Sequence, residues 1–327
     1  MSEPSGEWAL IDWIRRSAMP DARAVPIGPG DDMALVGSGD AEFLITVDVL
    51  LEGTHFDLRT ATPRQVGYKA LAVSLSDAAA MAALPVAAVA WVGFPAKTTM
   101  KFAKDLSRGL WDAAGRFACP IVGGDITSWP HAEPAGKPSS EKEARDGRLT
   151  VGTALVARPA GIRPVRRSGA RPGDRLFVTG RLGGSVLGRH LDFVPRVAEA
   201  RLLAQTADLH AMMDISDGLS TDLGHICRES GVGAVVRAEA VPVSPDAERL
   251  ARKDGRTPLD HALNDGEDFE LLFAVGAADA AHLVAEKPLG DLALTPIGEV
   301  IAGAGVVLVA PDGSRRPLPP GGWEHLR

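Results

Sequence analysis

Short apolar runs alternate with longer helical patterns along most of the chain. The runs are rich in β-branched and apolar residues and are bounded by glycine or proline, a pattern typical of buried strands. We expect strands at residues 42–52, 87–95, 121–126, 149–157, 174–180, 212–216 and 269–275. Helices are predicted to begin at Thr62, where a capping hydroxyl precedes a proline, near residues 98–99, and at Asp217-Gly218.

Both halves of the chain mix strands with helices, which indicates an α/β or α+β fold. A chain of 327 residues is long for one core, so two domains are expected. Proline and glycine break the pattern at residues 158–164, and we place an N-terminal domain at 1–160 and a C-terminal domain at 161–327. Residues 131–147 are polar and carry two prolines, so we expect a mobile surface loop there.

Composition and charge exclude several classes of protein. Asp and Glu number 42 against 35 Lys and Arg, so the basic footprint of a nucleic-acid binder is absent. The two cysteines, Cys119 and Cys227, lie far apart in no CxxC spacing, which argues for reduced buried thiols and against a disulfide framework or zinc site. The sequence shows neither a signal-peptide pattern at its start nor an apolar run of membrane length, so we expect a cytoplasmic protein without a membrane partner.

Aspartates are the informative feature, because many of them stand in glycine-rich turns or within apolar segments. They are Asp31 and Asp32 in GPGDDMAL, Asp48 in ITVDVLL, Asp77 in ALAVSLSDAAAM, Asp125 in IVGGD, and Asp214 and Asp217 in MMDISDGLS. A buried ionised carboxylate is costly unless it is paired or binds a metal, and the neighbours in sequence supply no Lys or Arg. Asp31 and Asp217 could each cap a turn or a helix. Apolar residues surround Asp48, Asp77 and Asp125, which makes a capping role harder to assign to them.

Converging carboxylates require cations to balance their charge. Oxygen ligands suit Mg²⁺, and five or six carboxylates are too many for a single ion. Several Mg²⁺ ions with a polyphosphate would balance the charge, which predicts phosphoryl transfer. The usual nucleotide motifs, the GxxxxGK[ST] loop and the HRD and DFG segments, are absent from the sequence.

The motifs also form an ordered set. GPGDDMAL, TVDVLLEGTHF, GYKALAVSLSDAAAMAALP, GGDIT, RRSGARPGD, MDISDGLSTDLGHI and NDGEDFELLF follow one another along the chain. In this order they resemble the thiamine-monophosphate kinases of the aminoimidazole-ribonucleotide-synthetase superfamily, over about residues 5–327 apart from the loop at 131–147. The resemblance implies a two-domain fold of mixed sheets flanked by helices. It also implies direct in-line transfer from ATP to thiamine monophosphate with several Mg²⁺ ions, in a homodimer built on the N-terminal domains.

The resemblance further assigns roles to single residues. It implies metal contacts for Asp32, Thr46, Asp48, Asp77, Asp125, Asp214 and Asp217, of which Asp48, Asp77 and Asp214 are the catalytic set. It implies nucleotide contacts for Gly124, Asp125, Arg167 and Ser216, and thiamine-phosphate contacts for His55, Glu267 and Trp323. An arginine can fork onto phosphate oxygens, and an aromatic ring can face a flat organic cation. Without the resemblance, a solvated arginine, an ordinary histidine, a solvated acidic turn and C-terminal packing are the plainer interpretations.

Two positions depart from the family pattern. Val47 and Ile126 stand where hydroxyl side chains are usual. These departures weaken the assignment of the acceptor more than that of the Mg-ATP chemistry. Two alternatives therefore stay open: a sibling ATP-dependent enzyme of the superfamily with another acceptor, and a catalytically silent regulator that binds Mg-nucleotide.

Overall fold

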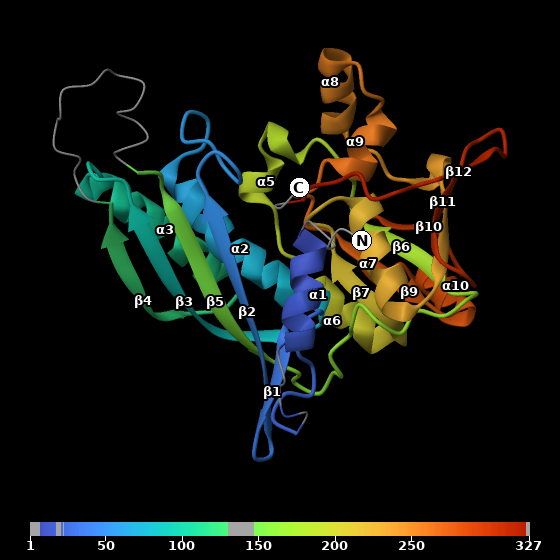
Figure 1. Ribbon diagram of the computed structural model, residues 1–327, viewed down its shortest axis with the longest axis horizontal. Coiled ribbons are helices and arrows are strands. Elements are labelled where there is room, and N and C mark those ends of the chain that lie inside the picture. The colour runs from blue at the N-terminus through green and yellow to red at the C-terminus, as the bar shows by residue number, and fades with distance from the viewer. Residues whose placement is uncertain (1–6, 18–20, 22, 130–146, 325–327) are drawn as a thin grey trace.

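The computed structural model describes residues 7–17, 21, 23–129 and 147–324. The loop expected at 131–147 lies outside the described residues except for Gly147. Two β-sheets stand side by side and helices cover them (Figure 1). No helix in these described ranges is long and apolar enough to cross a membrane.

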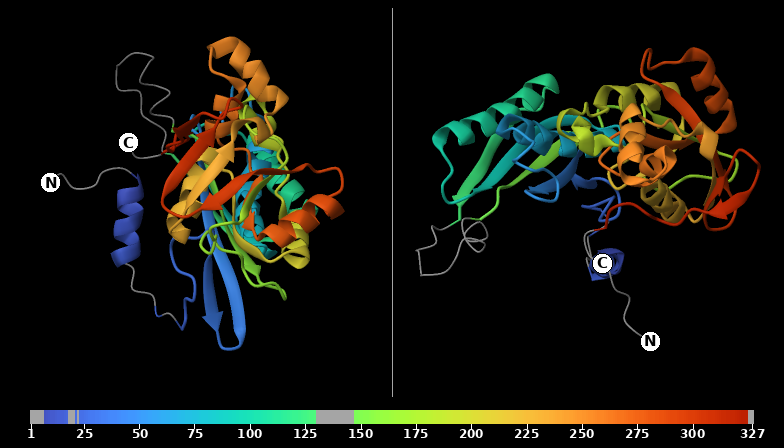
Figure 2. Two further views of the ribbon diagram at one scale, coloured as in Figure 1. Left: turned by 90° about the vertical axis from the view of Figure 1, so that its right-hand side faces the viewer. Right: turned by 90° about the horizontal axis from the view of Figure 1, so that it is seen from above.

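The first half of the chain forms a five-stranded sheet in the order β1-β2-β5-β3-β4. Its strands are β1 (Ala34–Ser38), β2 (Ala41–Leu51), β3 (Leu84–Phe94), β4 (Ile121–Ser128) and β5 (Thr150–Arg158). Among the described strands of this sheet, only β3 and β4 pair in parallel. Helices α2 (Pro63–Ala80) and α3 (Met100–Arg116) lie on one side of the sheet, as the view from above shows (Figure 2). Helix α1 (Glu7–Ser17) lies apart from this sheet and is joined to the second half of the chain by an Arg15–Glu229 ion pair of 2.8 Å.

The second half forms a seven-stranded sheet in the order β12-β11-β8-β10-β6-β9-β7. Its strands are β6 (Arg175–Thr179), β7 (Leu209–Asp214), β8 (Gly233–Arg237), β9 (Leu271–Val275), β10 (Leu294–Ile301), β11 (Gly305–Val309) and β12 (Arg315–Pro317). The helices are α5 (Arg189–Asp192), α6 (Val197–Thr206), α7 (Leu219–Ser230), α8 (Pro245–Asp254), α9 (Pro258–Asn264) and α10 (Ala277–Glu286). Short 3₁₀ turns cover Ser185–Leu187 and Ala238–Ala240.

Helix α2 connects the two halves. It begins at a capping box in which Thr62 and Gln65 each accept a backbone hydrogen bond from the other. The helix contacts β2, β5 and α3 in the first half and α5, α6 and β7 in the second. It crosses α3 with backbones touching, because a Cβ atom at Gly67 would lie 2.0 Å from the Leu106 carbonyl oxygen. A helix buried on nearly all sides can therefore present polar groups to a site between the sheets.

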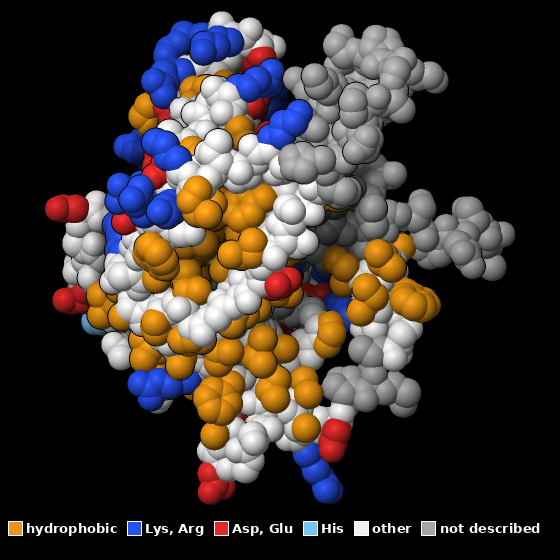
Figure 3. Space-filling view, turned by 90° about the vertical axis from the view of Figure 1, so that its left-hand side faces the viewer, with side chains coloured by type: hydrophobic (Ala, Val, Ile, Leu, Met, Phe, Trp, Pro, Cys, Tyr) orange, Lys and Arg blue, Asp and Glu red, His pale blue; other side chains and the backbone are white. Residues whose placement is uncertain are grey.

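The other face of the first sheet carries apolar side chains that no helix covers. Every second residue of β2 from Phe43 to Leu51 is an exposed hydrophobic residue, and Val89 of β3 is exposed on the same face, across β5. Seen from the side of β4, the molecule shows hydrophobic side chains gathered at this end (Figure 3). Strands with one face turned toward water normally place polar residues on that face, so an apolar outer face is unusual for an isolated chain.

The sequence-based elements compare well with the structure. All seven predicted strands are confirmed with small shifts at their ends, and α2 and α3 begin after Thr62 and Thr99 as expected. The third helix begins directly after Asp217-Gly218, as expected, and its N-cap is Gly218, so the alternative of Asp217 as the helix cap is not confirmed. Strands β1, β8, β10, β11 and β12 were not predicted. The placement of a domain boundary at 158–164 stays a prediction; β5 ends at Arg158 and β6 begins at Arg175.

Candidate active site

Three carboxylates converge between the two sheets. One oxygen each from Asp32, Asp77 and Asp214 lies within 4.8 Å of the other two. They come from the loop before β1, from the last turns of α2 and from the end of β7. Thr46 on β2 donates a hydrogen bond to Asp77, and Asp48 lies two residues farther along the same strand, on the same side of the sheet. The structure therefore brings five of the predicted metal-contact residues together.

Two serines of α2 hold the carboxylates of other elements. Ser74 Oγ donates to Asp48 Oδ2 at 2.6 Å, and Ser76 Oγ donates to Asp214 Oδ2 at 2.5 Å. Both serines are buried in the second half of the helix, where Asp77 is the only other residue that is not alanine, valine or leucine. Neither serine was predicted from the sequence to be a site residue. Their signal was present, because small hydroxyl residues flank Asp77 inside the apolar run ALAVSLSDAAAM.

The electrostatics of this cluster are unfavourable without cations. Burial raises the pKa of Asp48 to about 6 against the opposing hydrogen bond from Ser74. Burial and the neighbouring charge of Asp32 raise the pKa of Asp214 to about 7. Burial, then the charges of Asp48 and Asp214, raise the pKa of Asp77 well above its ordinary value. At neutral pH the protein holds several carboxylates that resist ionisation together, as expected of a site built for cations.

Two arginines that are distant in sequence approach this cluster. Arg167 donates to Asp32 Oδ1 through Nη2 at 2.6 Å and Nε at 3.2 Å. Arg166 Nε and the Arg167 backbone N–H donate to Asp31 at 2.9 Å and 2.7 Å. The Asp31 carboxylate therefore binds the Arg166–Arg167 segment before β6, in place of the turn-capping role considered as an alternative. Neighbours in sequence supply no Lys or Arg to these two aspartates, and the tertiary fold supplies both arginines from a segment about 135 positions away.

The donor set fits Mg²⁺. Its ligands are oxygens, and Asp32 Oδ2 is buried with no hydrogen-bond partner among the described residues. Such a buried unpartnered carboxylate oxygen is costly unless a cation or water completes it. Asp217 lies in a separate group with Asp222 and His225. There Asp222 Oδ2 accepts the backbone N–H groups of Asp217 and Gly218 at 3.2 Å and 3.0 Å, which fixes the turn that precedes α7.

A pocket of about 450 Å³ opens beside the carboxylates. The predicted thiamine-phosphate contacts His55, Glu267 and Trp323 all line it. So do Asp48, Ser216 and Asp217 from the predicted metal and nucleotide sets. The rest of the lining combines the apolar side chains of Val47, Val49, Leu50, Val73, Val186 and Phe269 with Thr54, Ser185 and Asp265. The lining thus combines acidic and apolar side chains, which suits a flat organic cation.

The C-terminal segment reaches this pocket because its backbone is anchored to α7 and to the turn before it. The Trp323 N–H donates to the Asp217 carbonyl at 3.0 Å. Gly321 and Gly322 donate their N–H groups to the hydroxyls of Ser220 and Thr221, each at 3.1 Å. A Cβ atom on Gly322 would lie 1.8 Å from the Asp217 carbonyl oxygen, so only glycine fits there. The indole itself is 49% exposed, so it lies in the pocket wall without being packed away.

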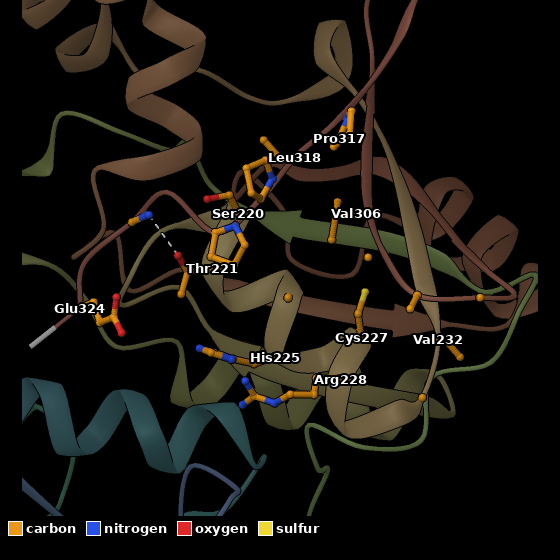
Figure 4. Close-up of a pocket in the computed structure, with 18 of the residues that line it drawn as sticks. Ser220, Thr221, His225, Cys227, Arg228, Val232, Val306, Pro317, Leu318 and Glu324 are labelled. Carbon is orange, nitrogen blue, oxygen red and sulfur yellow. Dashed lines mark hydrogen bonds between the residues drawn. The ribbon is translucent and has the colours of Figure 1, made fainter. Parts of the chain in front are cut away.

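A larger pocket of about 680 Å³ lies on the far side of the same segment (Figure 4). It is bounded by α7, the start of β11 and residues 317–324, and Thr221, His225 and Leu318 are among the side chains drawn around it. Of the predicted site residues, only Trp323 lines it. The C-terminal segment therefore forms a wall shared by the two pockets.

Gly124 and Asp125 do not join the carboxylate cluster in a single chain. They lie on β4, an exposed edge strand, so the expectation that apolar residues bury Asp125 is wrong. Asp125 pairs with Trp91, whose ring lies against Gly152 on the outer face of the sheet. Asp48 faces the opposite side, toward α2. Alternation along strands therefore separates Asp125 from Asp48 by the thickness of the sheet.

Comparison with known proteins identifies relatives over most of the chain. The family model for the AIR synthase related protein, N-terminal domain, matches residues 30–144, and the model for its C-terminal domain matches residues 171–310. A thiamine-monophosphate kinase from Rhodopirellula baltica is 37% identical over 290 residues, covering 86% of this chain and 85% of that protein. A thiamine-monophosphate kinase from Aquifex aeolicus is 32% identical over 341 residues, covering 98% of both.

Solved structures that are similar to this chain include members of the same family. A structure described as AaThiL complexed with AMPPCP and TMP has a TM-score of 0.80 at 31% identity, covering 98% of this chain and 97% of that one. The thiamine-monophosphate kinase from Stenotrophomonas maltophilia K279a has a TM-score of 0.68 at 31% identity, covering 94% and 97%. The likeness thus extends over most of the chain, including both sheets.

Proposed function

This chain belongs to the thiamine-monophosphate kinase family, and on that premise we propose that it transfers the γ-phosphoryl group of ATP directly to the phosphate of thiamine monophosphate. One observation carries the proposal. The pocket that holds all three predicted acceptor contacts, His55, Glu267 and Trp323, shares Asp48 with the buried carboxylate cluster. The related structure described as complexed with AMPPCP and TMP supports ATP and thiamine monophosphate as the two substrates.

Different residues are assigned to the metal ions and to the nucleotide. Asp32, Asp48, Asp77 and Asp214 would hold Mg²⁺, which when bound neutralises phosphate charge and favours attack at the γ-phosphorus. Arg167 lies beside Asp32 and is placed to bind a phosphate oxygen. Ser216, in the pocket wall, is the other nucleotide contact in this proposal, and the contacts of Gly124 and Asp125 remain predictions.

The transfer itself is a single displacement. A terminal phosphate oxygen of thiamine monophosphate forms a bond to the γ-phosphorus, while the bond from that phosphorus to the β–γ bridging oxygen breaks. ADP leaves with the electron pair, and the products are ADP and thiamine diphosphate. The phosphate oxygen is itself the nucleophile, so the protein has to orient both phosphates and exclude water.

We also propose that two copies of the chain associate through the outer face of the first sheet. The face is formed by Phe43, Ile45, Val47 and Val49 of β2 with Val89 of β3, all of which are exposed. A contiguous apolar sheet face in water favours burial against another surface. A second copy is the simplest occupant, because a two-fold pairing applies the same face twice.

An acceptor panel tests the activity. The protein is incubated with Mg-ATP and a set of phosphorylated acceptors that includes thiamine monophosphate, and the products are identified by mass. We expect thiamine diphosphate and an equal amount of ADP, and no product after EDTA is added. ADP formed only with another acceptor would favour a sibling enzyme. Nucleotide binding without turnover would favour the silent regulator.

A further inference from the structure

Lys69 is a charged side chain that the mechanism above does not use. It lies in the second turn of α2, and its side chain is 0% exposed. Its Nζ donates to Glu267 Oε1 at 2.6 Å and to the His55 carbonyl oxygen at 2.7 Å. An ammonium group without partners at this depth would be strongly destabilising, so these bonds determine where it can point. Burial lowers the pKa of Lys69, and the charge of Glu267 opposes that change.

Both partners of Lys69 belong to the acceptor pocket. His55 follows β2 in the first half of the chain, and Glu267 precedes β9 in the second half. A single buried ammonium thus joins the two walls of the pocket across the boundary between the sheets. Lys69 itself does not line the pocket.

Glu267 needs such support because its backbone is strained. Its φ is +52°, a left-handed conformation that is unfavourable for a non-glycine residue, and Phe269 repeats it at +50°. The Glu267 N–H donates to the Ser216 carbonyl at 2.6 Å. A Cβ atom on Gly266 would lie 2.7 Å from the same oxygen, so the turn is pressed against the Ser216 segment. Strain of this kind persists only where the surroundings hold the residue in place.

We propose that Lys69 is a positioning residue for the acceptor. It binds one oxygen of Glu267 and the backbone of His55, and thereby leaves the second oxygen of Glu267 for a cationic or amine-bearing acceptor in the pocket. The side chain of Glu267 is 27% exposed, which is consistent with one bound and one accessible oxygen. This inference rests on the proposed function, because it concerns binding of the same acceptor.

A double-mutant cycle tests the inference. Lys69→Met keeps the length and apolar stem of the side chain and removes the charge, and Glu267→Gln keeps the shape of its partner. We expect Lys69→Met to raise the KM and Kd for thiamine monophosphate roughly tenfold or more, with the KM for ATP changed less than about twofold. If Lys69 acts through Glu267, the double variant binds thiamine monophosphate no more weakly than Glu267→Gln alone.

Arg196→Met is the matched control. Arg196 also pairs with a buried carboxylate, through a 2.6 Å contact with Glu270, but neither residue lines the acceptor pocket. This variant should lose thermal stability without separating the two KM values. Lys69→Met with the same outcome, a lower Tm and unchanged acceptor affinity, would overturn the inference.

Two other outcomes also test the role of Lys69: a Lys69→Met variant that does not fold, and a wild-type protein that uses another acceptor. If Lys69→Met does not fold, the double variant is compared with Glu267→Gln, where equal acceptor affinity supports the inference and a further loss overturns it. Wild-type turnover is measured first. If the wild-type protein accepts only another phosphorylated compound, the proposed function fails, and the same variants measured with that compound show whether Lys69 still positions the acceptor.

Discussion

Mutually repelling carboxylates are the residues on which the chemistry depends. Asp48→Asn, Asp77→Asn and Asp214→Asn should each reduce turnover by on the order of a hundredfold or more, because each removes a charge that holds cations. The same variants should keep or raise the Tm of the metal-free protein, since one repelling charge is gone. Asp105→Asn on the surface of α3, where Asp105 pairs with Lys101, is the control and should retain full activity. Unfolding of all three buried variants would show that these aspartates are structural.

The pH dependence of stability follows from the raised pKa values. Asp48 and Asp214 titrate near 6 and 7 in the folded protein, above their ordinary value of 3.8. The folded state therefore binds more protons than the unfolded chain, and the stability from these groups is lost as the pH rises through 6 to 7. The Tm of metal-free protein should fall by several degrees between about pH 5 and pH 8, and Asp214→Asn should reduce that fall. Equal pH slopes for the two proteins would contradict this explanation.

Substitution of Trp323 tests whether this residue contributes to acceptor binding in the pocket. Trp323→Ala should raise the KM for thiamine monophosphate about tenfold, corresponding to about 1–2 kcal/mol of lost stacking, and leave the KM for ATP nearly unchanged. The fold should survive, because the anchoring bond is made by the backbone N–H of this residue. Trp111→Ala removes a tryptophan from α3 that is also exposed, at 63% against 49% for Trp323, and lies outside the pocket, so it should change neither value. A lower Tm with both KM values unchanged would make Trp323 a packing residue.

Sequence alone could identify individual site residues but not their partners. Asp48 and Asp77 were noticeable because an unpaired charge is costly in an apolar segment. Arg167 could not be assigned to Asp32, because their contact spans 135 positions and depends on the tertiary fold. Lys69 was overlooked for the same reason, since its partner Glu267 lies 198 positions away in the other half of the chain.

At the scale of elements, the strands and the two long helices could be predicted from local patterns. Thr62 and Thr99 each cap a helix through a bond made within three residues, so the signal is contained in a short segment. The position of Asp125 could not be predicted, because the face on which a side chain lies depends on pairing between β3 and β4. Apolar neighbours along β4 were read as burial, whereas the strand lies at an exposed edge.

The outer face of the first sheet yields a prediction about assembly. Ile45→Lys combined with Val89→Lys places two charges on the apolar face outside the acceptor pocket. If two copies associate through this face, the wild-type protein should sediment as a dimer and the double variant as a monomer. Val284→Lys, at an exposed apolar position on α10, is the control and should leave the mass unchanged. A monomeric wild-type protein, or a double variant that remains dimeric, would contradict association through this face.

At the scale of the whole molecule, the two sheets contribute different parts of one site. The first supplies Asp48, His55 and, through α2, Asp77, while the second supplies Asp214 and Glu267. Helix α2 contacts both, so its position sets the distance between the acceptor pocket and the carboxylates. Neither half holds a complete set, and the chemistry therefore requires that they pack together.

Isotope labelling tests most directly whether the γ-phosphoryl group of ATP passes directly to thiamine monophosphate. The protein is incubated with thiamine monophosphate and with ATP that carries ¹⁸O in the non-bridging γ-oxygens. The masses of the products and of the intact protein are then measured by mass spectrometry. Direct transfer predicts that the label appears in the terminal phosphate of thiamine diphosphate, that ADP forms in equal amount, that the protein gains no mass, and that EDTA stops the reaction. Label found only in inorganic phosphate, or retained on the protein as a stable phosphoryl group, would contradict the account.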